Sequence, residues 1–183
     1  MHGNTFVSIL SILASISVAI ALASSIAETL AKIRASSYKT MTATIISTIT
    51  EAVVTEFRNA WRISGGGSGE IEGAVLIYQT ADGAISARSL GQTNQRRRFT
   101  IICDPEVIAI VHTHPNKSNA QPEEEDLEIA DHLRIPVFTI TNRGMYVYDP
   151  GSRKISKIQK GLNWLDPAKW IQGERLAVKS SGL

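Results

Sequence analysis

The chain has 183 residues, of which 43% are hydrophobic and 20% charged, with a formal net charge of +2. These values are ordinary for a folded protein, so one core with an appendage is expected, and the charge gives no support for nucleic-acid binding. The one basic run, Arg96-Arg97-Arg98, precedes an apolar segment and is interpreted as a solvated turn. The single cysteine, Cys103, excludes an intrachain disulfide and a metal site built from several cysteines.

The first 35 residues form a separate hydrophobic segment. No Asp, Glu, Lys or Arg precedes Glu28, and residues 6–23 are mostly Ile, Leu, Val, Ala and Ser. This stretch is long enough to span a bilayer, and the cations that follow it would keep the rest of the chain in the cytoplasm. We therefore expect a hydrophobic N-terminal helix that anchors the protein in a membrane. A secreted protein whose signal is cleaved after Ala21-Leu22-Ala23, and a soluble or interfacial helix, are the alternatives.

A compact domain is predicted over residues 40–160, followed by a C-terminal tail over residues 161–183. Its first element is an amphipathic helix over Thr40–Trp61, because apolar residues recur there at spacings of three and four. They are Ile46, Ile49, Val53, Phe57 and Trp61. The glycine-rich run at residues 65–69 ends this helix and is predicted to be a loop or short linker.

The segments that follow have the composition of β-strands. Gly73–Tyr78 and Ala84–Leu90 flank the turn sequence Ala81-Asp82-Gly83, which predicts a hairpin. Two further strands are expected at Phe99–Cys103 and Val107–Val111. The second of these runs directly into a pair of histidines.

A polar loop after the histidines leads to a helix that opens with Glu123-Glu124-Glu125-Asp126, where carboxylates suit the positive end of the helix dipole. A strand is expected at Ile135–Ile140, and the turn Asn142-Arg143-Gly144 joins it to a strand at Met145–Tyr148. A short helix is expected near Trp164 in the tail. This order of elements predicts an α/β (α+β) fold with a mixed β-sheet flanked by helices.

His112 and His114, in Val-His-Thr-His-Pro, carry the clearest chemical signal. Two residues apart in a strand, they project to the same side, where two imidazoles can bind one cation. Asp126 is the candidate third ligand, because a tight loop can return the start of the next helix over the strand end. Two histidines and one carboxylate suit a catalytic zinc with a fourth position open to water. Glu72 is the candidate general base if its strand lies beside the histidines, whereas His132 is interpreted as a surface or packing residue.

With this pattern the chain resembles the JAMM/MPN+ metallopeptidase superfamily, whose motif is a Glu on an early strand, His-x-His-Pro, a short loop and Ser-x-x-Asp. The resemblance covers roughly residues 40–149 and is closest to bacterial JAB-like domains, including C-terminal modules of Rhs-type polymorphic toxins. It implies a cytidine-deaminase-like JAB/MPN fold, with Glu72 as the base that takes a proton from water. It also implies zinc as the cofactor, a peptide or isopeptide-linked protein as the substrate, and three metal ligands, which are His112, His114 and Asp126.

The motif serine, which helps to stabilise the oxyanion in the family, is replaced here by Glu123. An ionised carboxylate cannot donate a hydrogen bond, so Glu123 would have to be protonated, be bypassed, or be replaced by another donor such as Ser118. A catalytically inactive MPN-like module that binds a protein partner is therefore the alternative function. A membrane-associated toxin or effector is a further alternative, which the hydrophobic N-terminal segment motivates.

Two site assignments stay open at the level of sequence. The loop between the histidines and the acidic helix start is one residue longer than the family pattern, so Glu125 is an alternative to Asp126 as metal ligand. Glu70 is an alternative to Glu72 as base if Gly73 is the glycine of the family's strand. We prefer Asp126 and Glu72.

Overall fold

The computed structural model describes Thr29 and residues 41–92 and 104–170. The chain divides into two units, Met1–Ser37 and Tyr38–Leu183, and the second holds the β-sheet. The hydrophobic helix predicted within residues 1–35 and the strand predicted at Phe99–Cys103 lie outside the described residues. Within the described part of the chain, no helix combines the length and the apolar character needed to cross a membrane.

The helix predicted over Thr40–Trp61 is two helices in the structure. Residues 41–48 are helical, and α2 spans Glu51–Ile63. The break falls at Thr50, whose hydroxyl accepts a hydrogen bond from the backbone amide of Val53 at 3.4 Å and so caps α2. The apolar face predicted from the spacing is nevertheless the buried face, because Val53 and Phe57 are at most 1% exposed.

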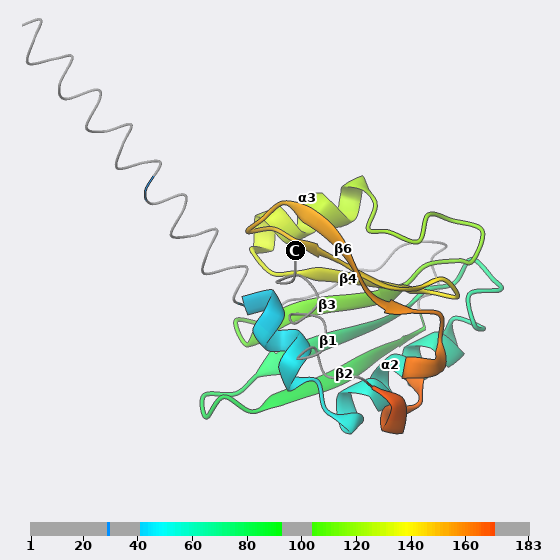
Figure 1. The fold of residues 1–183 in the computed structure, drawn as a ribbon, viewed down its shortest axis with the longest axis horizontal. Helices are drawn as coiled ribbons and strands as arrows, with labels where there is room; N and C mark the ends of the chain where they lie inside the picture. The colour runs from blue at the N-terminus through cyan, green and yellow to red at the C-terminus, as the bar shows by residue number, and fades with distance from the viewer. Residues whose placement is uncertain (1–28, 30–40, 93–103, 171–183) are drawn as a thin grey trace, which may run out of the picture. The chain divides into compact units, whose positions relative to one another are not determined.

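Six strands form one mixed sheet in the order β2-β1-β3-β4-β5-β6 (Figure 1). The strands are β1 (Gly73–Gln79), β2 (Ile85–Gln92), β3 (Val107–Thr113), β4 (Val137–Thr141), β5 (Gly144–Asp149) and β6 (Lys154–Lys160). β3 and β4 are parallel, with α3 (Glu124–Leu133) between them in sequence, and the other neighbours are antiparallel. The predicted mixed sheet with flanking helices and both predicted hairpins are confirmed.

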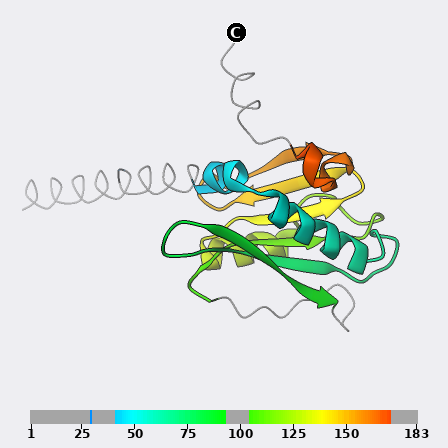
Figure 2. The ribbon, with the colours of Figure 1, turned by 90° about the horizontal axis from the view of Figure 1, so that it is seen from below.

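The sheet buries a different row of side chains on each face. Val75, Val111 and Phe138 belong to the large core cluster that α2 covers, whereas Leu76 and Ile110 belong to the smaller cluster that includes Ala130 of α3. Figure 2 shows α2 lying along the sheet. Successive residues of a strand alternate between faces, so the side chains at positions 112 and 114 lie on the same face as Ile110, which is the face that α3 covers. Both of these residues are histidines.

β6, one of the two edge strands of the sheet, was not among the strands predicted from the sequence. Only Ile158 of its seven residues is buried, so the strand lacks the apolar alternation that identifies strands in a sequence. Two short 3-10 helices follow, η1 (Asn163–Leu165) and η2 (Pro167–Lys169). Trp164 of η1 packs edge-on against Phe57 of α2, with ring centroids 6.4 Å apart. The start of the predicted tail is therefore part of the core.

The glycine-rich run after α2 is a packed loop rather than a linker. Gly65, Gly66 and Gly67 have φ angles of +66°, +66° and +68°, a region that L side chains rarely adopt. A Cβ atom on Gly67 would lie 2.8 Å from Oδ1 of Asn116. The Asn116 side chain donates to the Gly66 carbonyl at 2.9 Å, and its backbone amide donates to the Gly67 carbonyl at 2.8 Å. The loop is thus tied to the segment that follows the histidines.

Candidate metal centre

The pairing of β1 with β3 decides which side chains meet the histidines. Ala74 pairs with His112 in the antiparallel ladder, and the backbone amide of Gly73 donates to Oγ1 of Thr113 at 2.9 Å. Continuing that register puts Glu72 opposite His114, on the same face of the sheet. The strand that follows Glu72 therefore lies beside the histidines, as a role for Glu72 as base requires.

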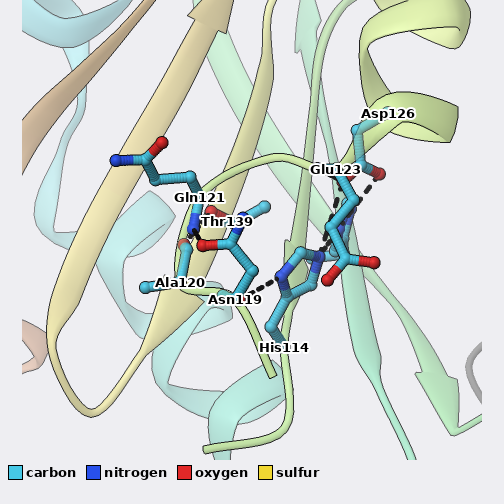
Figure 3. Close-up of polar contacts among 8 residues, drawn as sticks. His114, Asn119, Ala120, Gln121, Glu123, Asp126 and Thr139 are labelled. Atoms are coloured by element: carbon cyan, nitrogen blue, oxygen red, sulfur yellow. Dashed lines mark hydrogen bonds and ion pairs between the residues drawn. The ribbon is translucent and has the colours of Figure 1, made fainter. Parts of the chain in front are cut away.

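His112, His114 and Asp126 bring their ligand atoms together at the end of β3. Figure 3 labels His114 and Asp126 of this cluster. Nε2 of His112 lies 2.9 Å from Nε2 of His114. Oδ1 of Asp126 lies 3.3 Å from Nε2 of His112, and Oδ2 lies 3.5 Å from Nε2 of His114. The side chains of the three residues are 11%, 6% and 14% exposed, in the order His112, His114, Asp126. The group is thus compact, largely shielded from water, and able to hold a metal ion.

The imidazole of His114 is oriented by a backbone carbonyl. Nδ1 of His114 lies 2.8 Å from the carbonyl oxygen of Asn119 (Figure 3). A carbonyl can only accept, so Nδ1 carries the proton and donates it. The lone pair of the neutral ring is then on Nε2, which is the nitrogen that faces His112 and Asp126. This is the tautomer that a metal ligand needs.

Asp126 is held by the first turn of α3. Its Oδ2 accepts a hydrogen bond from the backbone amide of Glu123, the N-cap residue, at 2.7 Å. Burial by itself would raise the pKa of Asp126, but the charge and the hydrogen bond of His112, with that amide, outweigh it and lower the pKa. The carboxylate is therefore ionised at neutral pH, which is the state that binds a cation.

His112 is the other group whose ionisation the cluster changes. Burial would lower its pKa, but the carboxylates of Asp126, Glu72 and Glu123 act in the opposite direction, and the pKa is raised. Glu72 and Glu123 are thus close enough to the cluster to act on His112 through their charge. Figure 3 shows Glu123 extending beside the His114 imidazole from the start of α3.

The preferred residues and their alternatives lie in different surroundings. Asp126 contacts the histidines, whereas Glu125 of the same turn is exposed. Glu72 acts on His112 and is half-buried, whereas Glu70 is exposed. His132 is exposed on α3, as expected of a surface residue. The acidic helix start therefore contributes the Asp126 carboxylate to the cluster.

Some residues that shape the centre had no recognisable pattern in the sequence. The Asn119 carbonyl is a backbone atom, which any residue type would provide. Thr139 supports the neighbouring carbonyl of Ala120 from β4, through a hydrogen bond of 2.7 Å between residues 19 apart in the chain. The sequence offered one signal for this contact, a threonine within an otherwise apolar strand, because a buried hydroxyl needs a hydrogen-bond partner.

The donor set of two histidines and one carboxylate has the chemistry that a zinc ion prefers. Zinc commonly binds imidazole nitrogen and carboxylate oxygen, and the ligand atoms of these three residues, one from each, lie within 4.8 Å of one another. Comparisons with protein-family models, curated proteins and solved structures give no match for this chain. Membership of the JAMM/MPN+ superfamily therefore remains an expectation from the motif.

Proposed function

We propose that this protein is a zinc-dependent hydrolase of the JAMM type, which cleaves an amide bond in a peptide or isopeptide-linked protein. The observation that carries the proposal is the convergence of His112, His114 and Asp126, with Glu72 immediately before the neighbouring strand β1. Three protein ligands of this kind are typical of catalytic zinc sites, which leave a fourth position open, whereas structural zinc sites have four.

The chain's own groups would divide the work of hydrolysis. When bound, zinc would polarise the scissile carbonyl and lower the pKa of water to about 7. His112, His114 and Asp126 would hold the ion. A carboxylate oxygen of Glu72 would accept a proton from the attacking water and return it to the leaving amine.

Glu123 is the feature that favours the second candidate function, an inactive MPN-like module that binds a protein. Its backbone amide already donates to Asp126, and its side chain replaces the family's hydroxyl donor. An ionised carboxylate at this position would repel an oxyanion rather than stabilise it. Hydrolysis by this chain therefore requires another donor or a protonated Glu123.

The decisive experiment measures zinc content and hydrolysis together, on the full chain and on two matched variants. Glu72→Gln and Glu70→Gln each remove one carboxylate, two positions apart. We expect the wild-type chain and both variants to hold one zinc ion per chain. The substrates are peptides, isopeptide-linked ubiquitin-like proteins and peptidoglycan-derived peptides. E72Q is expected to lose about 10²–10⁴-fold in rate, whereas E70Q retains it.

The other outcomes are informative. A wild-type chain that holds zinc but cleaves none of these substrates supports the protein-binding module. A wild-type chain that holds no zinc contradicts the hydrolase. Loss of hydrolysis in E70Q rather than E72Q would move the base to Glu70.

A further inference from the structure

Thr139 lies at the centre of β4, directly beside the histidine pair. It pairs with His112 in the parallel β3–β4 ladder and is fully buried. Its neighbours Phe138 and Ile140 belong to the core on the α2 face, so the Thr139 side chain lies on the opposite face, with His112 and His114. A hydroxyl in such a position is costly unless it is hydrogen-bonded.

The partner of this hydroxyl is the loop that orients His114. Oγ1 of Thr139 donates to the carbonyl oxygen of Ala120 at 2.7 Å, and Ala120 is 5% exposed (Figure 3). The preceding carbonyl, that of Asn119, accepts from Nδ1 of His114. Two consecutive carbonyls are thus bound, one by the rigid sheet and one by the histidine. The Asn119 side chain adds a local bond, since its Oδ1 accepts from the Gln121 amide at 3.2 Å.

We propose that Thr139 is a positioning residue for the metal centre, which holds the Asn119 carbonyl where it selects the Nδ1-protonated form of His114. The inference rests on the proposed zinc site. Without the Thr139 hydroxyl, the buried Ala120 carbonyl loses a partner and the loop at residues 119–121 is less constrained. The proton on His114 is then less firmly kept at Nδ1, and Nε2 is less available to a metal. Groups that orient a ligand histidine typically contribute about 10–100-fold to metal affinity.

β4 offers a matched control at Thr141. It is equally buried and lies two residues further along, but its hydroxyl contacts the β4–β5 turn, with Arg143 N donating to it at 3.2 Å. Thr139→Val and Thr141→Val therefore remove the same group from the same strand. Only the first removes a bond to the loop that orients His114.

The test is the zinc affinity of the full chain, measured by competition with a chromophoric chelator. We expect T139V to bind zinc about 10–100-fold more weakly than wild type, and T141V and Thr139→Ser to bind as wild type does. The visible absorption of the cobalt-substituted protein should change in T139V alone, because it reports the geometry of the ligands. Thermal unfolding of the metal-free variants shows whether T139V and T141V are destabilised to a similar extent.

Equal zinc affinity in T139V and wild type would overturn the role of Thr139, as would an equal loss in T141V or no rescue by T139S. If T139V does not fold, Thr139→Ala removes the same hydroxyl without placing a methyl group against the Ala120 carbonyl, and it is read in the same way. A wild-type chain that binds no zinc contradicts the proposed function itself, so the two failures are distinguishable.

Discussion

Nε2 of His112 and Nε2 of His114 face each other across 2.9 Å. The bond from Nδ1 of His114 to the Asn119 carbonyl leaves Nε2 of His114 as an acceptor. Nε2 of His112 would be repelled at this distance unless it donates a proton to Nε2 of His114 or a metal ion binds both nitrogens. The neighbouring carboxylate of Asp126 adds negative charge to the same point. A proton or a metal cation bound at this place would therefore stabilise the folded chain.

Zinc is accordingly expected to raise the thermal stability of the protein. At a free concentration 100-fold above the dissociation constant, the gain is about 2.7 kcal/mol. Thermal unfolding with zinc and with a chelator measures it. His112→Gln should abolish the shift, whereas His132→Gln, on the exposed side of α3, should preserve it. A zinc shift of full size in H112Q would show that the ion binds elsewhere.

Replacing Asp126 and replacing its neighbour Glu125 are expected to affect metal binding differently. Asp126→Asn removes the charge that faces both histidines and is expected to weaken zinc binding by at least about tenfold. Glu125→Gln removes an equal charge from an exposed position and should leave the affinity unchanged. Chelator competition compares the two. A larger loss of zinc affinity in E125Q than in D126N would show that Glu125, rather than Asp126, binds the metal.

The local signals in the sequence were sufficient to predict the core of this site. The pair His112 and His114 follows from strand alternation, and the amphipathic face of α2 follows from helical spacing. The choice between Glu125 and Asp126 depended on the length of a loop, which the sequence does not fix in space. The bond from Thr139 to Ala120 depends on the parallel pairing of β3 with β4, a contact between distant parts of the chain. Tertiary structure alone determines such contacts.

The metal-free chain should have a specific dependence of stability on pH. The pKa of His112 is raised above its ordinary value of 6.5, so its contribution is complete below pH 6.5 and is lost as pH rises through the raised value. The pKa of Asp126 is lowered from 3.8, so its contribution is present above pH 3.8 and is lost as pH falls further. The contribution of this pair to stability is therefore greatest between pH 3.8 and pH 6.5.

Denaturant unfolding in the presence of a chelator, at several pH values between about 5.5 and 8.5, tests this dependence. The free energy of unfolding of the wild type should fall as pH rises, and D126N should show a weaker fall because His112 has lost its main charged partner. Zinc affinity should instead increase as pH rises, since a ligand histidine must lose its proton before it can bind the metal. An equal pH dependence in wild type and D126N would contradict the pairing.

Gly73 is required by the close approach of α2 to β1. A Cβ atom there would lie 2.3 Å from the carbonyl oxygen of Ala60, which is backbone and cannot turn aside. Gly73→Ala should therefore lower the free energy of unfolding by about 1–3 kcal/mol or more. Gly69→Ala is the matched control, because the nearest atom to its Cβ, the Ile71 nitrogen, is 3.9 Å away. Urea unfolding compares them, and equal stability of the two variants would contradict the predicted clash.

Asn116 joins three segments around the site. Its Nδ2 donates to the Gly66 carbonyl at 2.9 Å, and its Oδ1 accepts from the Asn142 amide at 3.2 Å. Asn116→Ala removes both bonds and should lower the free energy of local opening of the glycine-rich loop by about 1–3 kcal/mol. Amide hydrogen exchange at residues 65–70 measures this opening.

Asn142→Ala is the control for this change, because it keeps the backbone amide that donates to Asn116. Since the glycine-rich loop leads directly into Glu72, N116A should also reduce hydrolysis more than it reduces zinc affinity. His114 keeps its own bond to Asn119 in that variant, so the metal ligands stay oriented. If instead N116A weakens zinc binding as strongly as it weakens hydrolysis, Asn116 supports the ligands rather than the approach of Glu72.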